Sequence, residues 1–430
     1  MYNKYLITVF IVTGLYFSSL SQIQTKNPYS MIGIGLIENP GNFVNPGMGG
    51  VSTAFYNKNA LNIANPAMLT YIDTLIFVGE FGVKTNISRM TTENYSPQIA
   101  KSANLNNFSF GFRGNKRWAA SFGITPHSIK GYRIADNSPE PNGVQFSKYY
   151  VGSGGINKLF IGNCFDITKN FSLGLNANYL FGKLEETSTL ITSNAIPNSY
   201  NTQIGTKQQV SGFTFLLGMN YFYKQSESSF YNFGITGTPK LKINAKETSL
   251  KGTIQRDNIW TFEDNKIVDT LKYDIDIPVK LDMPASISFG IGRSQLNKSN
   301  TSFDYTFTNW GATNYEDIRN SHRLALGHLV VPQWNSPMKY FKRVTYRMGA
   351  FYEIMNIEIT DNKQNKTGIN SYALTAGLGL PIRRGFYNCD LDLQVGQTGT
   401  HKNGNISDIF VRINVRIRFN EIWFYKPKYD

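Results

Sequence analysis

Apolar and polar residues alternate one by one along most of this chain, from Leu75 to Phe419. Such alternation is typical of β-strands, because successive side chains of a strand point to opposite faces of the sheet. It is clearest in the segments 171–182, 213–223, 285–291, 303–307, 344–352, 374–380, 387–395 and 409–419. Roughly 12 to 15 strand-like segments follow one another between turns and longer polar stretches. The pattern predicts an all-β protein.

Composition narrows the kind of β protein. Charged residues make up 17% of the chain, aromatic residues make up 14%, and there are 38 glycines. After the first twenty residues, no apolar run reaches the ~18 residues that a transmembrane helix needs. These features suit an outer-membrane barrel, whose apolar side chains face outer-membrane lipid and whose polar side chains line the lumen. A soluble β-sandwich is the alternative, because alternation does not reveal which face is buried.

The first 21 residues resemble a secretory signal peptide. Lys4 supplies a positive start, residues 6–17 form an apolar core, and Ser19-Leu20-Ser21 is a small-x-small cleavage site. We therefore expect export and a mature chain that begins at Gln22. Together with the barrel pattern, this predicts the outer membrane of a Gram-negative bacterium.

The stretch 47–73 differs from the strands that follow it. Gly47, Gly49 and Gly50 interrupt regular structure at its start, and Pro66 prevents a continuous helix. Apolar residues are spread through it: Val51, Ala54, Phe55, Leu61, Ile63, Ala67, Met68 and Leu69. A compact, irregular, half-apolar segment needs an enclosure that satisfies its backbone polar groups. We interpret it as a plug, or hatch, inside the barrel; the alternative is an ordinary lead-in to a soluble β domain.

The last two predicted strands carry opposite charges on their polar faces. Asp390 and Asp392 lie on the first of them, and Arg412 and Arg416 lie on the second. If the strands are neighbours, these side chains meet across the lumen wall and hold it in register. Such ion pairs serve the structure and need have no bearing on transport.

Motifs in order along residues 45–419 resemble the FadL family, which transports long-chain fatty acids and aromatic hydrocarbons across the outer membrane. The hatch signature is Asn62-Ile63-Ala64-Asn65-Pro66-Ala67-Met68-Leu69, after the small-residue run 47–54. Segments 281–292, 303–310, 346–350 and 376–381 resemble later barrel strands of the family. The resemblance implies a transmembrane antiparallel barrel of about 14 strands (74–419), preceded by an N-terminal extension and hatch (22–73) and followed by a periplasmic tail (420–430).

The resemblance also implies roles for single residues. The hatch motif comprises Gly47, Gly49, Gly50, Asn65, Pro66 and Ala67. Transport of an apolar carboxylate needs a lumenal pocket with an apolar part and a cationic end, with a sideways exit through the wall. The candidates are Phe55, Leu61, Met68 and Phe351 for the apolar part, and Arg113, Arg347, Arg412, Arg416 and Arg418 for the charge. In the simpler interpretation, the apolar residues attach the hatch to the wall and the arginines pair with acids.

Two features depart from the family pattern: the extension ahead of the hatch, and the tail with Trp423, Phe424 and Tyr425. Both resemble divergent members from Bacteroidetes-type bacteria, some of which are subunits of larger outer-membrane machines. The tail aromatics suit a docking peptide or the membrane interface. Two functions therefore stand side by side: passive uptake of hydrophobic small molecules, and a non-transporting accessory subunit that binds partners in an outer-membrane complex.

Other chemistry finds little support. The net charge is +14, but the Lys and Arg residues are scattered, so we expect no nucleic-acid partner. His127, His322, His328 and His401 fall in predicted loops or strand ends without metal-ligand spacing. Cys164 and Cys389 are far apart and are interpreted as inert apolar fillers. We expect no enzyme, metal or cofactor.

The longer polar stretches 185–209, 245–269, 316–342 and 358–370 are the predicted outer loops.

Overall fold

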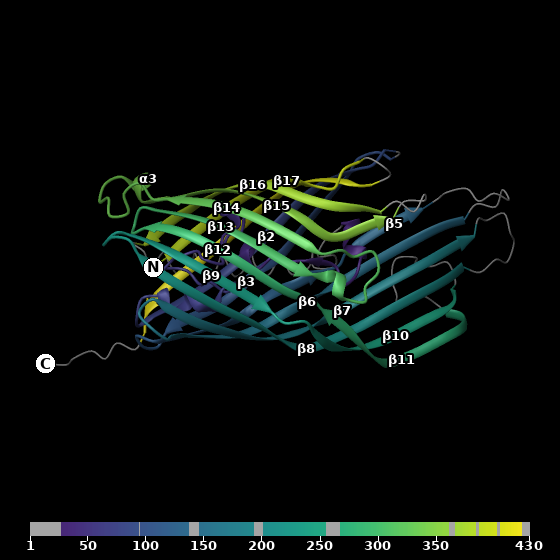
Figure 1. The fold of residues 1–430 in the computed structure, drawn as a ribbon. Helices are drawn as coiled ribbons and strands as arrows, with labels where there is room; N and C mark the ends of the chain where they lie inside the picture. The colour runs from purple at the N-terminus through teal and green to yellow at the C-terminus, as the bar shows by residue number, and fades with distance from the viewer. Residues whose placement is uncertain are drawn as a thin grey trace, which may run out of the picture.

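A computed structural model of the chain describes residues 27–93, 95–136, 146–192, 201–254, 267–360, 366–383, 387–401 and 405–423. Strands dominate it and belong to one antiparallel sheet (Figure 1). They are β1 (Leu36–Ile37), β2 (Ile76–Thr91), β3 (Gln98–Arg113), β4 (Trp118–Ile129), β5 (Tyr132–Asp136), β6 (Phe146–Asp166), β7 (Phe171–Thr192), β8 (Asn201–Lys224), β9 (Ser229–Thr238), β10 (Leu241–Ile254), β11 (Ile267–Met283), β12 (Ala285–Gln295), β13 (Ser299–Asn309), β14 (Ser321–Val330), β15 (Thr345–Thr360), β16 (Lys366–Arg383), β17 (Tyr387–Thr398) and β18 (Ser407–Ile422).

The sheet closes into a barrel because its last strand pairs with its first wall strand. β18 pairs with β2 from Ser407–Thr91 to Ile422–Ile76, and with β17 on its other side. β1 belongs to the plug and β5 is a short branch beside β6. β9–β10 and β11–β12 are each one wall strand interrupted near a proline, Pro239 or Pro284, which cannot donate to a β-ladder. Among the described residues, the wall thus has fourteen strands, which confirms the number that the family resemblance implies.

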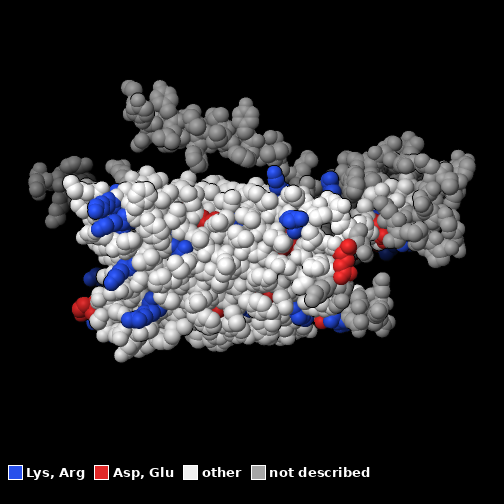
Figure 2. All heavy atoms as spheres, turned by 90° about the horizontal axis from the view of Figure 1, so that it is seen from above, with Lys and Arg blue, Asp and Glu red and all other residues white. Residues whose placement is uncertain are grey.

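The apolar side chains of the wall strands lie on the outer face of the barrel. On the outer face, Phe213 and Leu374 are 64% and 73% exposed, whereas Asp390 and Arg416 on the inner face are 0% and 2% exposed. Figure 2 shows a wall with few charged side chains along its middle and with Lys and Arg gathered toward its two ends. This arrangement is the inverse of a soluble sandwich and confirms the outer-membrane type of barrel fold.

The chain ahead of β2 fills the lumen from one end to the other. It contains β1 and the short helices η2 (Pro28–Met31), α2 (Gly41–Val44), η3 (Pro46–Met48) and η4 (Pro66–Tyr71). At the end of the barrel where β18 begins, which we call the loop end, Asn27 N donates to Gly131 O. At the opposite, C-terminal end, where β18 finishes, Arg418 donates to Asn59 O. We call residues 27–73 the plug. Among the described residues, no helix has both the length and the apolar character needed to cross a membrane.

Helix η5 (Trp310–Ala312) lies on the connection from β13 to β14, and α3 (Tyr340–Arg343) lies on that from β14 to β15. The predicted outer loop 316–342 is therefore wrong, because it contains wall strand β14. The inner positions of β14 include the small residues Ala325 and Gly327, which weaken the apolar alternation. His322 and His328 are not in a loop either; they lie on the outer side of β14 with Leu324 and Leu326.

The predicted element boundaries differ slightly from the structure. The first wall strand begins at Ile76 and the last ends at Ile422, beyond the predicted limit at 419. The predicted signal peptide (1–21) and the tail residues from Phe424 onward lie outside the described residues. Trp423 is described, and its ring stacks on Phe77 of β2 at a centroid distance of 4.0 Å.

Candidate functional site

Side chains of the wall satisfy backbone groups of the plug. Thr375 Oγ1 accepts from Gly49 N at 2.8 Å, and Arg323 Nη2 donates to Gly49 O at 2.9 Å. Asp304 Oδ2 accepts from Ser52 N and Thr53 N at 2.6 and 2.8 Å. Further contacts of this kind join Glu80 to Leu61 N, Gln394 to Pro46 O, Asn176 to Ile63 O and Ser172 to Ala67 O. The irregular segment thus has the enclosure that its buried backbone requires.

The hatch-motif residues shape the plug itself. Gly49 and Gly50 have φ of +68° and +80°, a left-handed backbone that favours glycine. Asn65 caps η4, because its Oδ1 accepts from Ala67 N at 3.0 Å. Its Nδ2 donates to Thr53 O at 2.6 Å and joins the two halves of the plug. Pro66 occupies the first position of η4, where its missing N–H costs nothing.

Wall glycines allow the plug to touch the wall backbone directly. A Cβ added to Gly234 of β9 would lie 2.0 Å from Thr53 O, and one added to Gly174 of β7 would lie 2.4 Å from Ala67 N. Others that face the plug in this way are Gly111, Gly218, Gly290, Gly292, Gly327, Gly349 and Gly377. They come from strands spread around the barrel, so the plug is seated against the wall on many sides.

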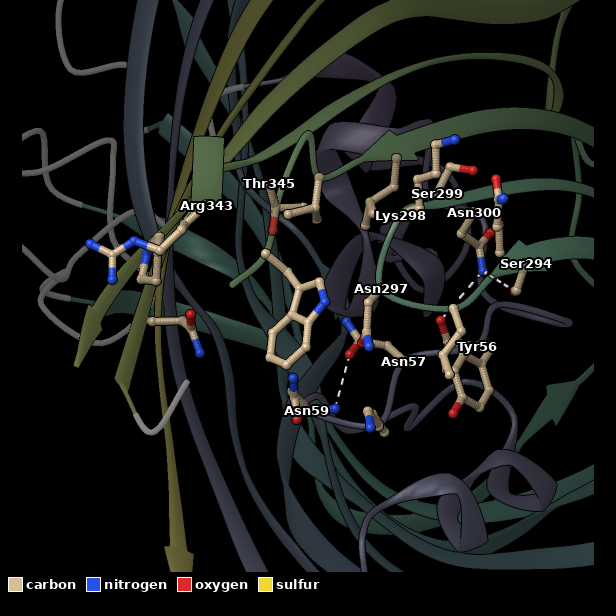
Figure 3. Close-up of a pocket in the computed structure, with 18 of the residues that line it drawn as sticks. Tyr56, Asn57, Asn59, Ser294, Asn297, Lys298, Ser299, Asn300, Arg343 and Thr345 are labelled. Carbon is tan, nitrogen blue, oxygen red and sulfur yellow. Dashed lines mark hydrogen bonds between the residues drawn. The ribbon is translucent and has the colours of Figure 1, made fainter. Parts of the chain in front are cut away.

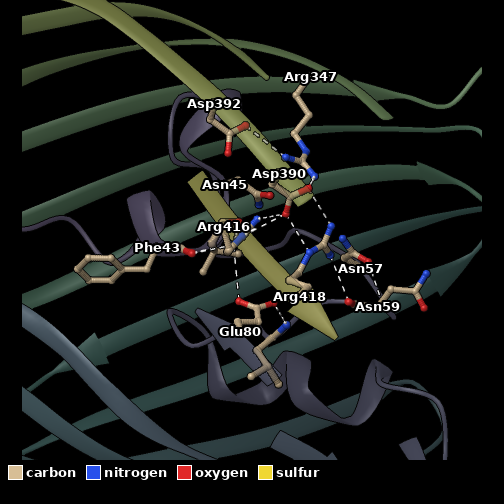
Figure 4. A network of polar contacts seen from close by, with 12 residues as sticks. Phe43, Asn45, Asn57, Asn59, Glu80, Arg347, Asp390, Asp392, Arg416 and Arg418 are labelled. Atoms are coloured by element: carbon tan, nitrogen blue, oxygen red, sulfur yellow. Dashed lines mark hydrogen bonds and ion pairs between the residues drawn. The ribbon is translucent and has the colours of Figure 1, made fainter. Parts of the chain in front are cut away.

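Asp390 is the centre of a buried ionic network between β15, β17 and β18 (Figure 4). Arg347 Nη2 donates to Asp390 Oδ1 at 2.6 Å, Arg416 Nη2 donates to Asp390 Oδ2 at 3.0 Å, and Arg418 Nε lies 2.9 Å from the same oxygen. Arg347 Nη1 also donates to Asp392 Oδ1 at 3.2 Å. Removing ions from water is costly, so each of these charges depends on its partners.

The network extends from the wall into the plug through Arg416. Arg416 Nη1 donates to Phe43 O and Val44 O, both at 2.8 Å, and lies 3.6 Å from Glu80 Oε2. Glu80 Oε1 accepts from Leu61 N at 2.9 Å. One arginine therefore links two wall carboxylates to the plug backbone, which makes the network a structural clamp.

The structure separates the predicted ligand residues into several places. Phe55, Leu61 and Phe351 are buried in one apolar cluster that plug and wall share, and Met68 of the plug is also buried. Arg347, Arg416 and Arg418 belong to the Asp390 network.

The remaining two predicted arginines lie apart from that network. Arg113 pairs with Asp166 at 3.3 Å near the C-terminal end. The expected meeting of Asp392 with Arg412 is wrong: Asp392 faces Asn414, and Arg412 faces Gln394. The Arg412 guanidinium instead lies 3.9 Å from the centre of the Phe410 ring.

Sequence reasoning missed Asp304, Arg323 and Gln394 as plug anchors. Each occupies an inward position of a strand, where polar residues are expected for any barrel lumen. The sequence shows only that these positions are polar. Polar character alone does not distinguish a residue that binds the plug from one that faces water in the lumen.

A cavity of about 210 Å³ with a mixed polar and apolar lining lies inside the barrel toward the loop end. Glu38, His127 and Lys158 line it, so His127 is a half-buried wall residue near the end of β4. Glu38 forms an ion pair with Lys84. Burial alone would raise the pKa of the Glu38 carboxyl, but the positive charges of Lys84 and Arg412 together outweigh burial and hold that pKa below its usual value. Lys158 has no ion pair among the described residues.

The wall ladder is incomplete beside this cavity. β3 pairs with β4 only from Phe108–Ile124 to Arg113–Ala119, which leaves residues 98–107 of β3 without β4 as a partner. The far end of β4 pairs with the plug strand β1 instead, after a register shift at Pro126. The barrel thus has an interrupted seam at β3–β4, covered from inside by the plug.

A second cavity, of about 670 Å³, opens at the C-terminal end (Figure 3). Its lining includes plug residues 56–59, the β12–β13 turn and the β14–β15 loop (331–344). We call it the vestibule. Cys164 and Cys389 are both unpaired, and no cluster of three metal-ligating side chains occurs within the described part of the chain.

Solved structures share this architecture. The toluene transporter TbuX of Ralstonia pickettii aligns with a TM-score of 0.55 at 15% identity, covering 87% of this chain and 97% of its own. The toluene transporter TodX of Pseudomonas putida gives 0.57 at 13% identity, with 89% and 98% covered. A FadL homologue of Pseudomonas aeruginosa gives 0.54 at 12% identity, with 91% and 100% covered.

These likenesses confirm the FadL-like fold that the hatch motif predicts. A comparison with curated protein sequences gives no match. A protein-family model described as BamG matches residues 1–430, the whole chain. The chain therefore belongs to the BamG family and has a FadL-like β-barrel fold.

Proposed function

We propose that this protein is a non-catalytic accessory subunit of a β-barrel assembly (BAM) complex in the outer membrane. Its family assignment supports the association. The observation that carries the non-transporting role is the seat of the plug: backbone contacts from Gly49 to Ala67 are fixed by wall side chains, and the wall glycines leave no space at these contacts. A plug held in this way stiffens the barrel as a platform for partners.

The test begins with the full-length protein, tagged and isolated from native outer membrane in mild detergent. Native mass spectrometry is expected to give a stoichiometric complex that contains barrel-assembly components. Depletion of the protein in cells is expected to slow the appearance of folded, heat-modifiable forms of other outer-membrane barrels. A lone protein that carries apolar small molecules, with normal barrel assembly in its absence, would contradict the proposal.

Passive uptake of hydrophobic molecules is the second candidate, and the interrupted β3–β4 seam favours it. The related solved channels are described as toluene transporters. The lumenal cavity beside the seam has Lys158, which forms no ion pair with any described residue and suits a carboxylate. Its volume of about 210 Å³ lies below the range of about 300–1,000 Å³ usual for ligand pockets, which is why we rank uptake second. Uptake of a labelled fatty acid that is lost in Lys158→Ala would reverse this ranking.

A further inference from the structure

We propose that the vestibule at the C-terminal end binds an acidic, extended peptide segment of a partner protein. This inference rests on the proposed function, since it names the chemistry of a partner within the complex. In a barrel whose C-terminus lies in the periplasm, the vestibule faces the periplasm, so the segment would come from a periplasmic domain.

The charge of the vestibule is the first argument. Its lining contains five cationic residues (Lys58, Lys298, Arg343, Arg347 and Arg418) and one acidic residue, Asp73, which lies 3.8 Å from Lys58. Arg347 and Arg418 are held by Asp390 behind the lining. Lys298 and Arg343 have no ion pair among the described residues. Figure 3 shows these two on opposite sides of the cavity, with the Arg343 guanidinium turned away from Lys298.

Unused hydrogen-bond donors are the second argument. The Nε atoms of Arg343 and Arg347 are buried and have no hydrogen-bond partner within the part of the chain that the structure describes. The Arg347 side chain is only 2% exposed. A buried guanidinium donor without a partner carries a penalty that an incoming carboxylate would relieve. The unused hydrogen-bond donors and the positive charge therefore both favour a carboxylate ligand.

The shape and the remaining lining favour a peptide. The cavity volume of about 670 Å³ lies within the usual range for binding pockets. Asn57, Asn59, Asn297 and Asn335 bring side-chain amides, which pair with the backbone groups of an extended chain. Plug residues form the inner lining, so this surface lies at the barrel mouth and is separate from the lipid-facing wall.

The β14–β15 loop carries exposed apolar side chains, and one of them, Trp334, lines the vestibule. Trp334, Met338 and Phe341 are 57%, 94% and 76% exposed. The loop is nevertheless ordered by internal bonds, since Gln333 N donates to Lys342 O at 2.8 Å and Tyr346 OH donates to Phe341 O at 3.1 Å. Exposed aromatic and Met side chains on a preformed loop are typical anchors of protein interfaces. The expected partner segment thus combines Asp or Glu residues with apolar ones.

The experiment places a photo-crosslinking amino acid at Asn335 in the full-length protein in cells, followed by mass spectrometry of the crosslinked peptides. Wild type is expected to capture one segment that contains Asp or Glu, and added salt is expected to weaken the capture. Lys298→Glu with Arg343→Glu is expected to lower the crosslink yield about tenfold. The matched control is Lys116→Glu with Arg117→Glu, the same charge change on an exposed turn at the same end, which should leave the yield unchanged.

Further outcomes separate the inference from the proposed function. Heat-modifiability confirms that each variant barrel is folded, and Trp334→Ala, which keeps the charges, is expected to lower the yield as well. Changing the captured acidic residues of the partner to Lys is expected to restore crosslinking to the charge-reversed variant. If wild type forms the complex but Asn335 captures only lipid or nothing, the inference is overturned and the proposed function stands. If wild type forms no complex, both are overturned.

Discussion

Asp390 of β17 and Arg416 of β18 are direct register partners, and the same arginine donates two hydrogen bonds to the plug carbonyls of Phe43 and Val44. This cross-strand ion pair therefore also attaches the plug to the wall. Because Arg347 and Arg418 share the same carboxylate, three cations depend on one buried anion.

Replacing Asp390 with Asn is expected to destabilise the folded barrel by about 3–5 kcal/mol, because it leaves buried guanidinium groups without their main counter-charge. Urea unfolding in detergent micelles, followed by tryptophan fluorescence, measures the change in the free energy of unfolding. The control is Asp269→Asn, an exposed carboxyl on β11. Equal stability of the two variants would contradict the central role of Asp390.

Arg412 and Arg416 allow a comparison on one strand. Arg416→Met is expected to loosen the plug, because it removes two hydrogen bonds to plug carbonyls and leaves Asp390 and Glu80 with less compensation. Arg412→Met removes a cation–π contact with Phe410, worth about 0.5–2 kcal/mol, together with the attraction of Arg412 to Glu38 and Asp408. Limited proteolysis of the plug is expected to be faster for Arg416→Met than for Arg412→Met, and the reverse order would show that the clamp lies elsewhere.

The sequence predicts β17 and β18 well because their alternation is unbroken, which places Asp390 and Arg416 on the same inward face. It does not predict that Arg347 joins them, since Arg347 lies on β15 and must reach across β16. It does so over Gly379, where a Cβ would lie only 3.0 Å from both Arg347 Nη2 and Asp390 Oδ1. Such contacts depend on the curvature of the closed wall, which no local pattern encodes.

The contacts between plug and wall are likewise not predicted by the local sequence. Its glycines, Asn65 and Pro66 predict an irregular segment, and the structure confirms that the wall encloses it. Which wall residue meets which plug group depends on how the segment threads the lumen. Asp304 is one example: it accepts from Ser52 N and Thr53 N although the chain separation is about 250 residues.

Gly234→Ala tests whether close approach of the two backbones seats the plug. The added Cβ would lie 2.0 Å from Thr53 O, so plug or wall must shift at a cost of about 1–3 kcal/mol. The expected results are faster proteolysis of the plug and raised ion conductance in planar bilayers. Gly237→Ala is the matched control on the same strand, because its added Cβ would lie 3.5 Å from Ser286 O, its nearest neighbour. Identical conductance of the two variants would argue against this seat.

The ion pair between Glu38 and Lys84 makes attachment of the plug near the loop end sensitive to acid. The pKa of Glu38 in the folded protein lies below its usual value, so the stabilisation is fully present above about pH 4.3 and is lost as the pH falls through the folded pKa. Hydrogen exchange can follow this at the Glu38 amide, which donates to His127 O at 3.0 Å. Its protection factor is expected to be constant from neutral pH to about pH 4.3 and to decrease below it. Glu38→Gln should show lower protection at neutral pH and a weaker dependence on acid; a wild-type protection factor that changes near neutral pH instead would assign the dependence to another group.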